Sequence, residues 1–332
     1  MDIVCLGELL VDMFPAEVGR PLVEVSAFRP VPGGAPANVA VAAARLGARS
    51  AFIGKVGDDA FGHHLADVLK QEGVDVRGMR FDDQARTTMN IMAQPDANSY
   101  VCLFYRNPGA DTLLRPDELD RRLLQETRAF HFGSLSLTDE PSRSTTLEAV
   151  GIAREAGALI SFDVNYRPTL WSSPAEAYDR VMAVVPYVNL LKVNEGELAL
   201  LAGSEDIDAA SQTLLKLGPD LCVVTLGPQG SFFRVAGGGE YVPAFAVHTV
   251  DATGCGDAFI AGLLWQLVNP HPGPPPERGK KSATWRDRLT PAYLRQGLRY
   301  ANAVGALTAQ TQGVIPALPT AAEVDSFLKR VS

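Results

Sequence analysis

The sequence has few cysteines, no long uncharged apolar run and no basic segment at its N-terminus. Its four cysteines, Cys5, Cys102, Cys222 and Cys255, lie far apart and form no CxxC pair. This favours reduced thiols over a disulfide framework or a zinc site. No run of 18 uncharged apolar residues occurs, so we expect no membrane span. An acid at position 2 does not fit a secretion signal. We therefore expect a cytoplasmic protein.

Two glycine-spaced nucleotide motifs are also missing. No GxxxxGK[ST] loop occurs, and no GxGxxG follows a strand-like run, which argues against a P-loop enzyme and a dinucleotide-dependent dehydrogenase. The five histidines are scattered without the spacing of a metal site. The net charge of −8 argues against nucleic-acid and membrane partners. A polyanionic substrate would need a local positive site.

The 332 residues, 46% of them apolar, alternate between short strand-like runs and helix-like segments. This predicts one α/β domain over 1–332, with a central, mostly parallel sheet flanked by helices. Ligands of such sheets bind beyond the carboxyl ends of the strands. Strands are expected at 3–7, 50–57, 130–135, 158–165, 188–194 and 221–227, and helices at 36–47 and 61–73 and from near Pro141, Pro174, Asn194 and Asp206.

One region breaks this alternation. Residues 87–94 and 99–106 form two β-like runs around a PDAN turn, and residues 12–31 are β-like without a following helix. We predict a small β-sheet lid built from about 12–32 and 85–107; the alternative is an antiparallel edge on the main sheet. Its apolar strands motivate a homodimer through the lid. The proline-rich stretch 269–282 is expected to be an exposed loop.

The stretch TVDATGCGDAF places three small residues before Asp257, and an apolar helical run follows. The first N–H groups of such a helix have no internal partner, and glycine lets them approach an anion closely. A carboxylate there would repel phosphate as a steady ligand, but it suits a base that deprotonates an attacking hydroxyl. A simple helix cap by Asp257 is the alternative.

Three further glycine or asparagine motifs accompany it. PGGAPANVA (32–40) puts two glycines before a helix that carries Asn38, whose amide can bind hydroxyls or act as a local cap. LLKVNEGELALL (190–201) places Asn194 and Glu197 either in a phosphate–magnesium site or in a capping box. VVTLGPQGS (223–231) is a glycine turn after a strand, or only a hairpin turn.

These motifs, in this order, resemble the ribokinase-like, or PfkB, family of carbohydrate kinases. GGAPANVAVAAARLG (33–47) is similar to the N-terminal signature of the family and DATGCGDAF (251–259) to its C-terminal one. The resemblance covers almost the whole chain. It implies a Rossmann-like ribokinase fold with a β-sheet lid, ATP as phosphoryl donor and Mg²⁺ as cofactor. Segments 51–81 and 103–114 look most like fructokinases, which implies that D-fructose and ATP give D-fructose 6-phosphate and ADP.

The resemblance also implies roles for individual residues. Asp257 is the implied catalytic base, beside an anion hole of backbone N–H groups from Gly254, Cys255 and Gly256. The implied sugar-binding residues are Asp12, Gly33, Gly34, Asn38, Arg106 and Arg167. The implied nucleotide residues are Lys192, Asn194, Thr225, Gly227, Gly230 and Asn302. Glu197 is implied to reach Mg²⁺ through water, and Asp251 and Thr253 to hold a monovalent cation such as K⁺.

Other functions stay open at this point. A 2-keto-3-deoxygluconate kinase or ribokinase would share the architecture, and a non-catalytic sugar-binding protein would keep the fold without the chemistry. The motif DATGCGD also departs from the common DTTGAGD at Ala252 and Cys255. Since a helix N-terminus can lower the pKa of a cysteine, we hypothesise that Cys255 is sensitive to oxidants; a small residue in a tight turn is the alternative.

Overall fold

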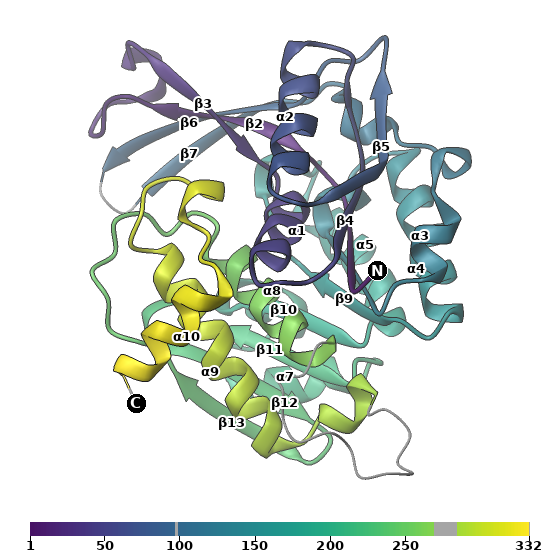
Figure 1. The fold of residues 1–332 in the computed structure, drawn as a ribbon, viewed down its shortest axis with the longest axis vertical. Helices are drawn as coiled ribbons and strands as arrows, with labels where there is room; N and C mark the ends of the chain where they lie inside the picture. The colour runs from purple at the N-terminus through teal and green to yellow at the C-terminus, as the bar shows by residue number, and fades with distance from the viewer. Residues whose placement is uncertain (97–98, 269–283, 332) are drawn as a thin grey trace.

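A central sheet of nine strands organises the chain in a computed structural model that describes residues 1–96, 99–268 and 284–331 (Figure 1). The order is β13-β12-β11-β10-β9-β8-β1-β4-β5, and β11 to β5 in this order run parallel. β12 and β13 add an antiparallel edge. The strands are β1 (Ile3–Leu6), β4 (Ser50–Gly57), β5 (Asp75–Asp82), β8 (Ala129–Gly133), β9 (Leu159–Asp163), β10 (Leu190–Asn194), β11 (Leu221–Thr225), β12 (Gly230–Val235) and β13 (Gly238–Pro243).

Helices cover both faces of this sheet. The bounds are α1 (Ala35–Arg45), α2 (Ala60–Gln71), α3 (Arg121–Gln125), α4 (Ser142–Glu155), α5 (Pro174–Val184), α6 (Glu195–Ala202), α7 (Ile207–Leu215), α8 (Cys255–Val268), α9 (Pro291–Thr308) and α10 (Ala321–Arg330). β1 shows the two-sided packing, because Ile3 and Cys5 join the core under α1, α8 and α9, whereas Val4 and Leu6 join the core under α4 and α5. The predicted parallel α/β sheet is confirmed.

A separate sheet of four strands stands beside the central one (Figure 1). Its order is β3-β2-β6-β7, from β2 (Leu10–Pro15), β3 (Phe28–Gly33), β6 (Met89–Asp96) and β7 (Ser99–Tyr105). We call it the small sheet. The expected second sheet is therefore present, and the alternative of an edge on the main sheet is wrong. The predicted loop at 269–282 lies outside the described residues.

The chain passes between the two sheets four times, at residues 7–9, at Gly34, at residues 83–88 and at residues 106–109. Strand β1 is the point where the strand order reverses, since β4 and β5 lie to one side of it and β8 to β11 to the other. In open α/β sheets ligands bind at such a reversal, beyond the carboxyl ends of the strands. The crossings thus lie where a ligand site is expected.

The ten helices whose bounds are given above include none that is long and apolar enough to cross a membrane, as judged over the described part of the chain.

Candidate active site

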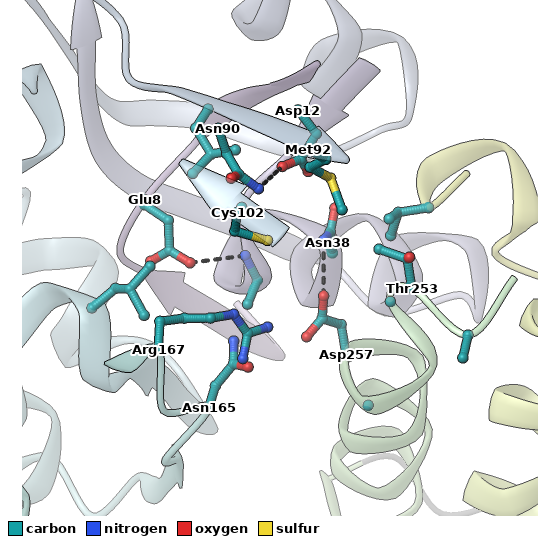
Figure 2. A pocket seen from close by; sticks show the side chains of 18 of the residues that line it. Glu8, Asp12, Asn38, Asn90, Met92, Cys102, Asn165, Arg167, Thr253 and Asp257 are labelled. Carbon is teal, nitrogen blue, oxygen red and sulfur yellow. Dashed lines mark hydrogen bonds between the residues drawn. The ribbon is translucent and has the colours of Figure 1, made fainter. Parts of the chain in front are cut away.

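A cavity of about 510 Å³ lies between the small sheet and the carboxyl ends of the central strands (Figure 2). It brings together residues from both predicted signatures, which are far apart in the sequence. The predicted site residues that line it are Asp12, Gly34, Asn38, Arg167, Lys192, Asn194, Thr225, Thr253, Gly254, Gly256 and Asp257. The predicted residues Gly33, Arg106, Glu197, Gly227, Gly230, Asp251, Cys255 and Asn302 are not among its lining residues.

Asp257 stands in the first turn of α8 and faces α1 across the cavity. Asn38 donates a hydrogen bond from Nδ2 to Oδ2 of Asp257 at 2.8 Å, so the two signatures meet directly (Figure 2). Gly254 precedes the helix with a φ of +77°, and a Cβ there would meet Val314 at 2.3 Å. Only glycine fits this turn without strain. The turn therefore fixes the start of α8 and with it the position of Asp257.

The environment of Asp257 makes its carboxyl more basic. Burial, together with the charge of Asp163, raises the pKa of Asp257 to about 7, although the Asn38 hydrogen bond and the cation of Lys192 oppose this rise. A base works best when its pKa lies near the working pH. Asp257 is therefore suited to taking a proton from a hydroxyl.

Positive charge gathers beside Asp257. A Cβ on Gly256 would lie only 3.2 Å from Nζ of Lys192, so the ammonium group lies against the N-terminus of α8. Lys192 pairs with Asp163 at 2.9 Å, and both side chains are buried. Burial alone would lower the pKa of Lys192, but the carboxylates of Asp163, Glu197 and Asp257 raise it above its usual range. Lys192 thus keeps its positive charge at the wall of the cavity.

The backbone at the start of α8 differs in part from the expected anion hole. The N–H of Cys255 donates to the carbonyl of Ala252 at 3.3 Å. Within the described residues, the N–H groups of Gly254 and Gly256 have no hydrogen-bond acceptor, and both residues line the cavity. Such free amides at a helix N-terminus favour an anion. Gly254 and Gly256 are better placed than Cys255 for that role.

The small sheet contributes Asp12 and Asn90 from two neighbouring strands. Nδ2 of Asn90 donates to Oδ1 of Asp12 at 2.8 Å (Figure 2). Burial raises the pKa of Asp12 to about 6, although Asn90 and Arg167 oppose the shift. Gly33 faces this carboxylate from β3, and a Cβ there would meet Oδ2 of Asp12 at 1.9 Å. Gly33 therefore acts by leaving room for Asp12.

Arg106 does not reach the cavity. Its guanidinium binds Asp111 at 2.7 Å, Oγ1 of Thr138 at 2.7 Å and the carbonyl of Leu135 at 2.9 Å. The other oxygen of Asp111 accepts a hydrogen bond of 2.5 Å from the hydroxyl of Thr88. Thr88 precedes β6 and Arg106 follows β7, so Asp111 holds both ends of one hairpin of the small sheet. We call Thr88, Arg106 and Asp111 the hairpin anchor.

Some of the predicted nucleotide residues line the cavity and others do not. Lys192, Asn194 and Thr225 line it, whereas Gly227, Gly230 and Asn302 do not. Asn194 and Thr225 line the cavity at the ends of β10 and β11. Asn194 and Glu197 form the capping box of α6, and the two Glu197 oxygens accept the N–H groups of Tyr166 and Asn194 at 2.7 and 2.8 Å. Asn302 donates to the carbonyls of Val242 and Pro243, at the end of β13.

The glycines of the predicted turn at 223–231 have backbone angles that suit them. Gly227 and Gly230 have φ values of +54° and +112°, and a Cβ on Gly230 would meet the carbonyl oxygen of Val242 at 2.2 Å. β11 and β12 pair antiparallel on either side of them. The hairpin turn that the sequence left open is therefore present.

The turn at 251–255 is closed by its own hydrogen bonds. Asp251 accepts from the N–H and hydroxyl of Thr253 at 2.9 and 2.7 Å and from the N–H of Gly313 at 3.0 Å. The hypothesis of a reactive Cys255 is wrong in its premise. Burial, reinforced by the carboxylates of Asp251 and Asp257, raises the pKa of Cys255 to about 12. The thiol therefore stays protonated despite its helix N-terminus.

Several polar residues of the cavity were not among the predicted site residues. Glu8 follows β1, Asn90 lies in β6, and Asn165 follows β9 with a φ of +39°. Glu8 is buried and accepts the N–H of Ala35, the first residue of α1, at 2.9 Å (Figure 2). A polar residue near the carboxyl end of an apolar strand was a usable signal for Glu8 and Asn165. Asn90 offered none, because it stands inside a strand.

Comparison with known proteins gives a consistent result. The model of the "pfkB family carbohydrate kinase" matches residues 1–321. A probable fructokinase-2 of Arabidopsis thaliana is 43% identical over 328 residues, which cover 98% of this chain and 95% of that protein. A fructokinase from Xylella fastidiosa, solved with bound ATP, superposes with a TM-score of 0.88 at 33% identity and covers 99% and 98% of the two chains. A Vibrio cholerae fructokinase with fructose, ADP and calcium ion bound superposes with a TM-score of 0.85 at 32% identity, and the match covers 98% of each chain.

Proposed function

The chain belongs to the pfkB family of carbohydrate kinases, and from that premise we propose that it transfers the terminal phosphate of ATP to D-fructose. The products are D-fructose 6-phosphate and ADP. The observation that carries this proposal is the Asp257 carboxyl, held by Asn38 at 2.8 Å in the cavity that Lys192 also lines. The relatives named above, which are fructokinases, support the choice of sugar.

The chemistry follows from the arrangement of these groups. Asp257 accepts the proton of the sugar's 6-hydroxyl as its oxygen attacks the terminal phosphorus of ATP, and ADP leaves. Lys192 and the free amides at the start of α8 offset the negative charge of the phosphoryl group in flight. Asp12, Asn38 and Arg167 hold sugar oxygens so that the acceptor hydroxyl meets the phosphate. The small sheet acts as a lid that excludes water.

Magnesium is proposed to enter with ATP. Mg²⁺ prefers oxygen ligands and keeps several waters, so phosphate oxygens can supply much of its coordination. Over the described residues no group of three or more His, Cys, Asp or Glu side chains could hold a metal ion. Glu197 does not line the cavity and both its oxygens accept backbone N–H groups, so it would act on a nucleotide-borne ion only through water. When bound, the ion neutralises phosphate charge.

A K⁺ site at Asp251 and Thr253 stays a prediction. The Asp251 carboxylate already accepts three protein hydrogen bonds, so a cation would share its oxygens with these donors. Phosphorylation rates measured in potassium and in tetramethylammonium salts test whether the protein depends on K⁺.

The test uses the purified protein, ATP, Mg²⁺ and a panel of sugars: D-fructose, 2-keto-3-deoxygluconate and D-ribose. We expect ADP release to be fastest with fructose. Asp257→Asn should lower kcat by roughly 10²–10⁴, the usual contribution of a general base, with little change in sugar affinity. Near wild-type turnover in this variant refutes the base assignment. Sugar binding without turnover in the wild-type protein supports a non-catalytic protein instead.

We further propose that two copies associate through the small sheet. Val101, Leu103 and Tyr105 alternate along β7 on one face and are 45%, 45% and 57% exposed. Their neighbours Cys102 and Phe104 line the cavity on the other face. A second copy is the proposed cover for this apolar row. Light scattering at micromolar concentration should give twice the chain mass. A wild-type mass of one chain, the same as that of Leu103→Glu, contradicts the proposal.

A further inference from the structure

Three residues that line the cavity carry an oxygen atom without a hydrogen-bond partner in the described structure. Among the described residues, the buried side-chain atoms without a hydrogen-bond partner include Glu8 Oε2, Asn38 Oδ1 and Asn90 Oδ1. All three residues line the cavity: Glu8 from the connection between β1 and β2, Asn38 from α1 and Asn90 from β6. A buried polar atom without a partner is costly, by about 1–3 kcal/mol. Three such oxygens in one cavity indicate a ligand that donates several hydrogen bonds, as the hydroxyls of a sugar do.

Glu8 is the member of this set that the proposed function has not used. It lies just after β1, where the strand order reverses, and its side chain is 3% exposed. Its Oε1 accepts the N–H of Ala35, which begins the helix that carries Asn38. This bond fixes the orientation of the carboxyl group and leaves Oε2 for a second partner. In Figure 2 Glu8 lies at the opposite side of the cavity from Thr253.

The nearby cation does not satisfy Oε2. The charge of Arg106 acts on Glu8 and lowers its pKa. The Arg106 guanidinium, however, donates its hydrogen bonds to Asp111, Thr138 and the carbonyl of Leu135. Burial and the charge of Asp111 raise the pKa of Glu8 to about 7, so the group can hold its proton or release it near neutral pH. Oε2 can therefore accept a hydrogen bond from a hydroxyl or donate one to it.

We propose that Glu8 is a substrate-contacting residue whose Oε2 forms a hydrogen bond with a hydroxyl of the bound sugar. The inference rests on the proposed function, since it assigns a contact within that site. It predicts that Glu8 helps to select a polyol with a hydroxyl at one defined position. It also assigns Oε1 a separate task, which is to hold the start of α1.

The two oxygens allow a test in which only one contact changes. Glu8→Gln can keep the acceptor for Ala35 and replaces Oε2 by an NH₂ group, whereas Glu8→Ala removes both. If Oε2 accepts the sugar hydroxyl, Glu8→Gln should raise the KM for D-fructose by about 10- to 100-fold, the range for a hydrogen bond to a charged group. The KM for ATP should stay within twofold. Glu72→Gln, which alters a pair with Arg45 outside the cavity, is the matched control and should leave both values unchanged.

Monodeoxy analogues of D-fructose that retain the acceptor hydroxyl identify the partner. The wild-type protein should lose kcat/KM with the analogue that lacks the contacted hydroxyl, and Glu8→Gln should lose little more with that analogue. This coupling also reveals the case in which Oε2 donates its proton, because Gln then preserves the contact and Glu8→Ala loses it. Equal penalties for every analogue in the wild type and both variants overturn the proposal.

A direct structure provides a test without substitutions. In a complex of the wild-type protein with D-fructose, a sugar oxygen should lie within about 3.2 Å of Oε2. A sugar bound beside Asp257 but out of reach of Glu8 overturns this inference and leaves the kinase assignment intact. A wild-type protein that phosphorylates no sugar fails the proposed function itself, so the two failures are distinguishable.

Discussion

The hairpin anchor allows a prediction that separates stability from sugar binding. Arg106 and Asp111 are 3% and 2% exposed, and they are 2.7 Å apart. Asp111→Asn keeps the shape of the side chain but leaves the Arg106 charge with only the more distant and exposed carboxylate of Asp139, at 3.5 Å. Removing one partner of a buried ion pair costs about 3–5 kcal/mol. At roughly 2–4 °C per kcal/mol, even the lower figure lowers Tm by roughly 6–12 °C.

The same substitution should weaken sugar binding through the small sheet. Thr88 lies two residues before Asn90, and Arg106 lies two residues after Phe104, so the anchor holds the ends of the two strands that carry these cavity-lining residues. Loss of one well-placed hydrogen bond to the sugar, about 1–2 kcal/mol, corresponds to a rise in KM of about 5- to 30-fold. ATP hydrolysis without sugar should also rise relative to phosphorylation, because a displaced lid admits water.

The assay combines thermal unfolding with coupled ADP release, measured with and without D-fructose. Glu72→Gln is the control, since it weakens the Arg45–Glu72 pair in the main body and should lower Tm without changing the KM for sugar. Thr88→Val removes only the hydroxyl at the start of the hairpin and should raise KM with a smaller loss of Tm. A lower Tm in Asp111→Asn with unchanged KM and unchanged sugar-independent hydrolysis refutes a positioning role for the anchor.

Two further predictions follow from the site. Since Asp257 must be ionised to act as a base and its pKa is raised to about 7, kcat/KM should fall as the pH drops below about 7; a profile that is flat down to pH 5 contradicts the assignment. Gly33→Ala should raise the KM for sugar severalfold with little effect on the KM for ATP, because the new Cβ would collide with the Asp12 carboxylate at 1.9 Å. Unchanged sugar affinity in this variant, measured by calorimetry, shows that Asp12 does not need that space.

The sequence predicted elements well where the signal is local. Helices begin near Pro174, Asn194 and Asp206 as expected, and the structure shows that Asn194 and Asp206 cap α6 and α7. Such signals depend on residues within one helical turn, so they survive without knowledge of the fold. Asn38 and Asp257 were predicted from two motifs, and the structure adds the hydrogen bond that joins them over 219 positions.

The remaining differences arise from contacts and burial that the sequence motifs do not reveal. Glu8 and Asn90 enter the cavity through contacts with distant parts of the chain, because Glu8 binds the start of α1 and β6 pairs with β2. Arg106 was expected at the sugar, but a partner five residues further along the chain binds its guanidinium in a buried pair. For Cys255 the helix N-terminus was considered, whereas burial and two nearby carboxylates dominate its pKa.

The four connections between the two sheets have a consequence for engineering. Each connection carries one residue of interest: Glu8 and Gly34 line the cavity, whereas Thr88 and Arg106 belong to the hairpin anchor. The small sheet is therefore no interchangeable module. Exchanging it for that of another kinase would also replace residues that shape the receptor for the substrate, so chimeras that alter specificity need junctions beyond these four crossings.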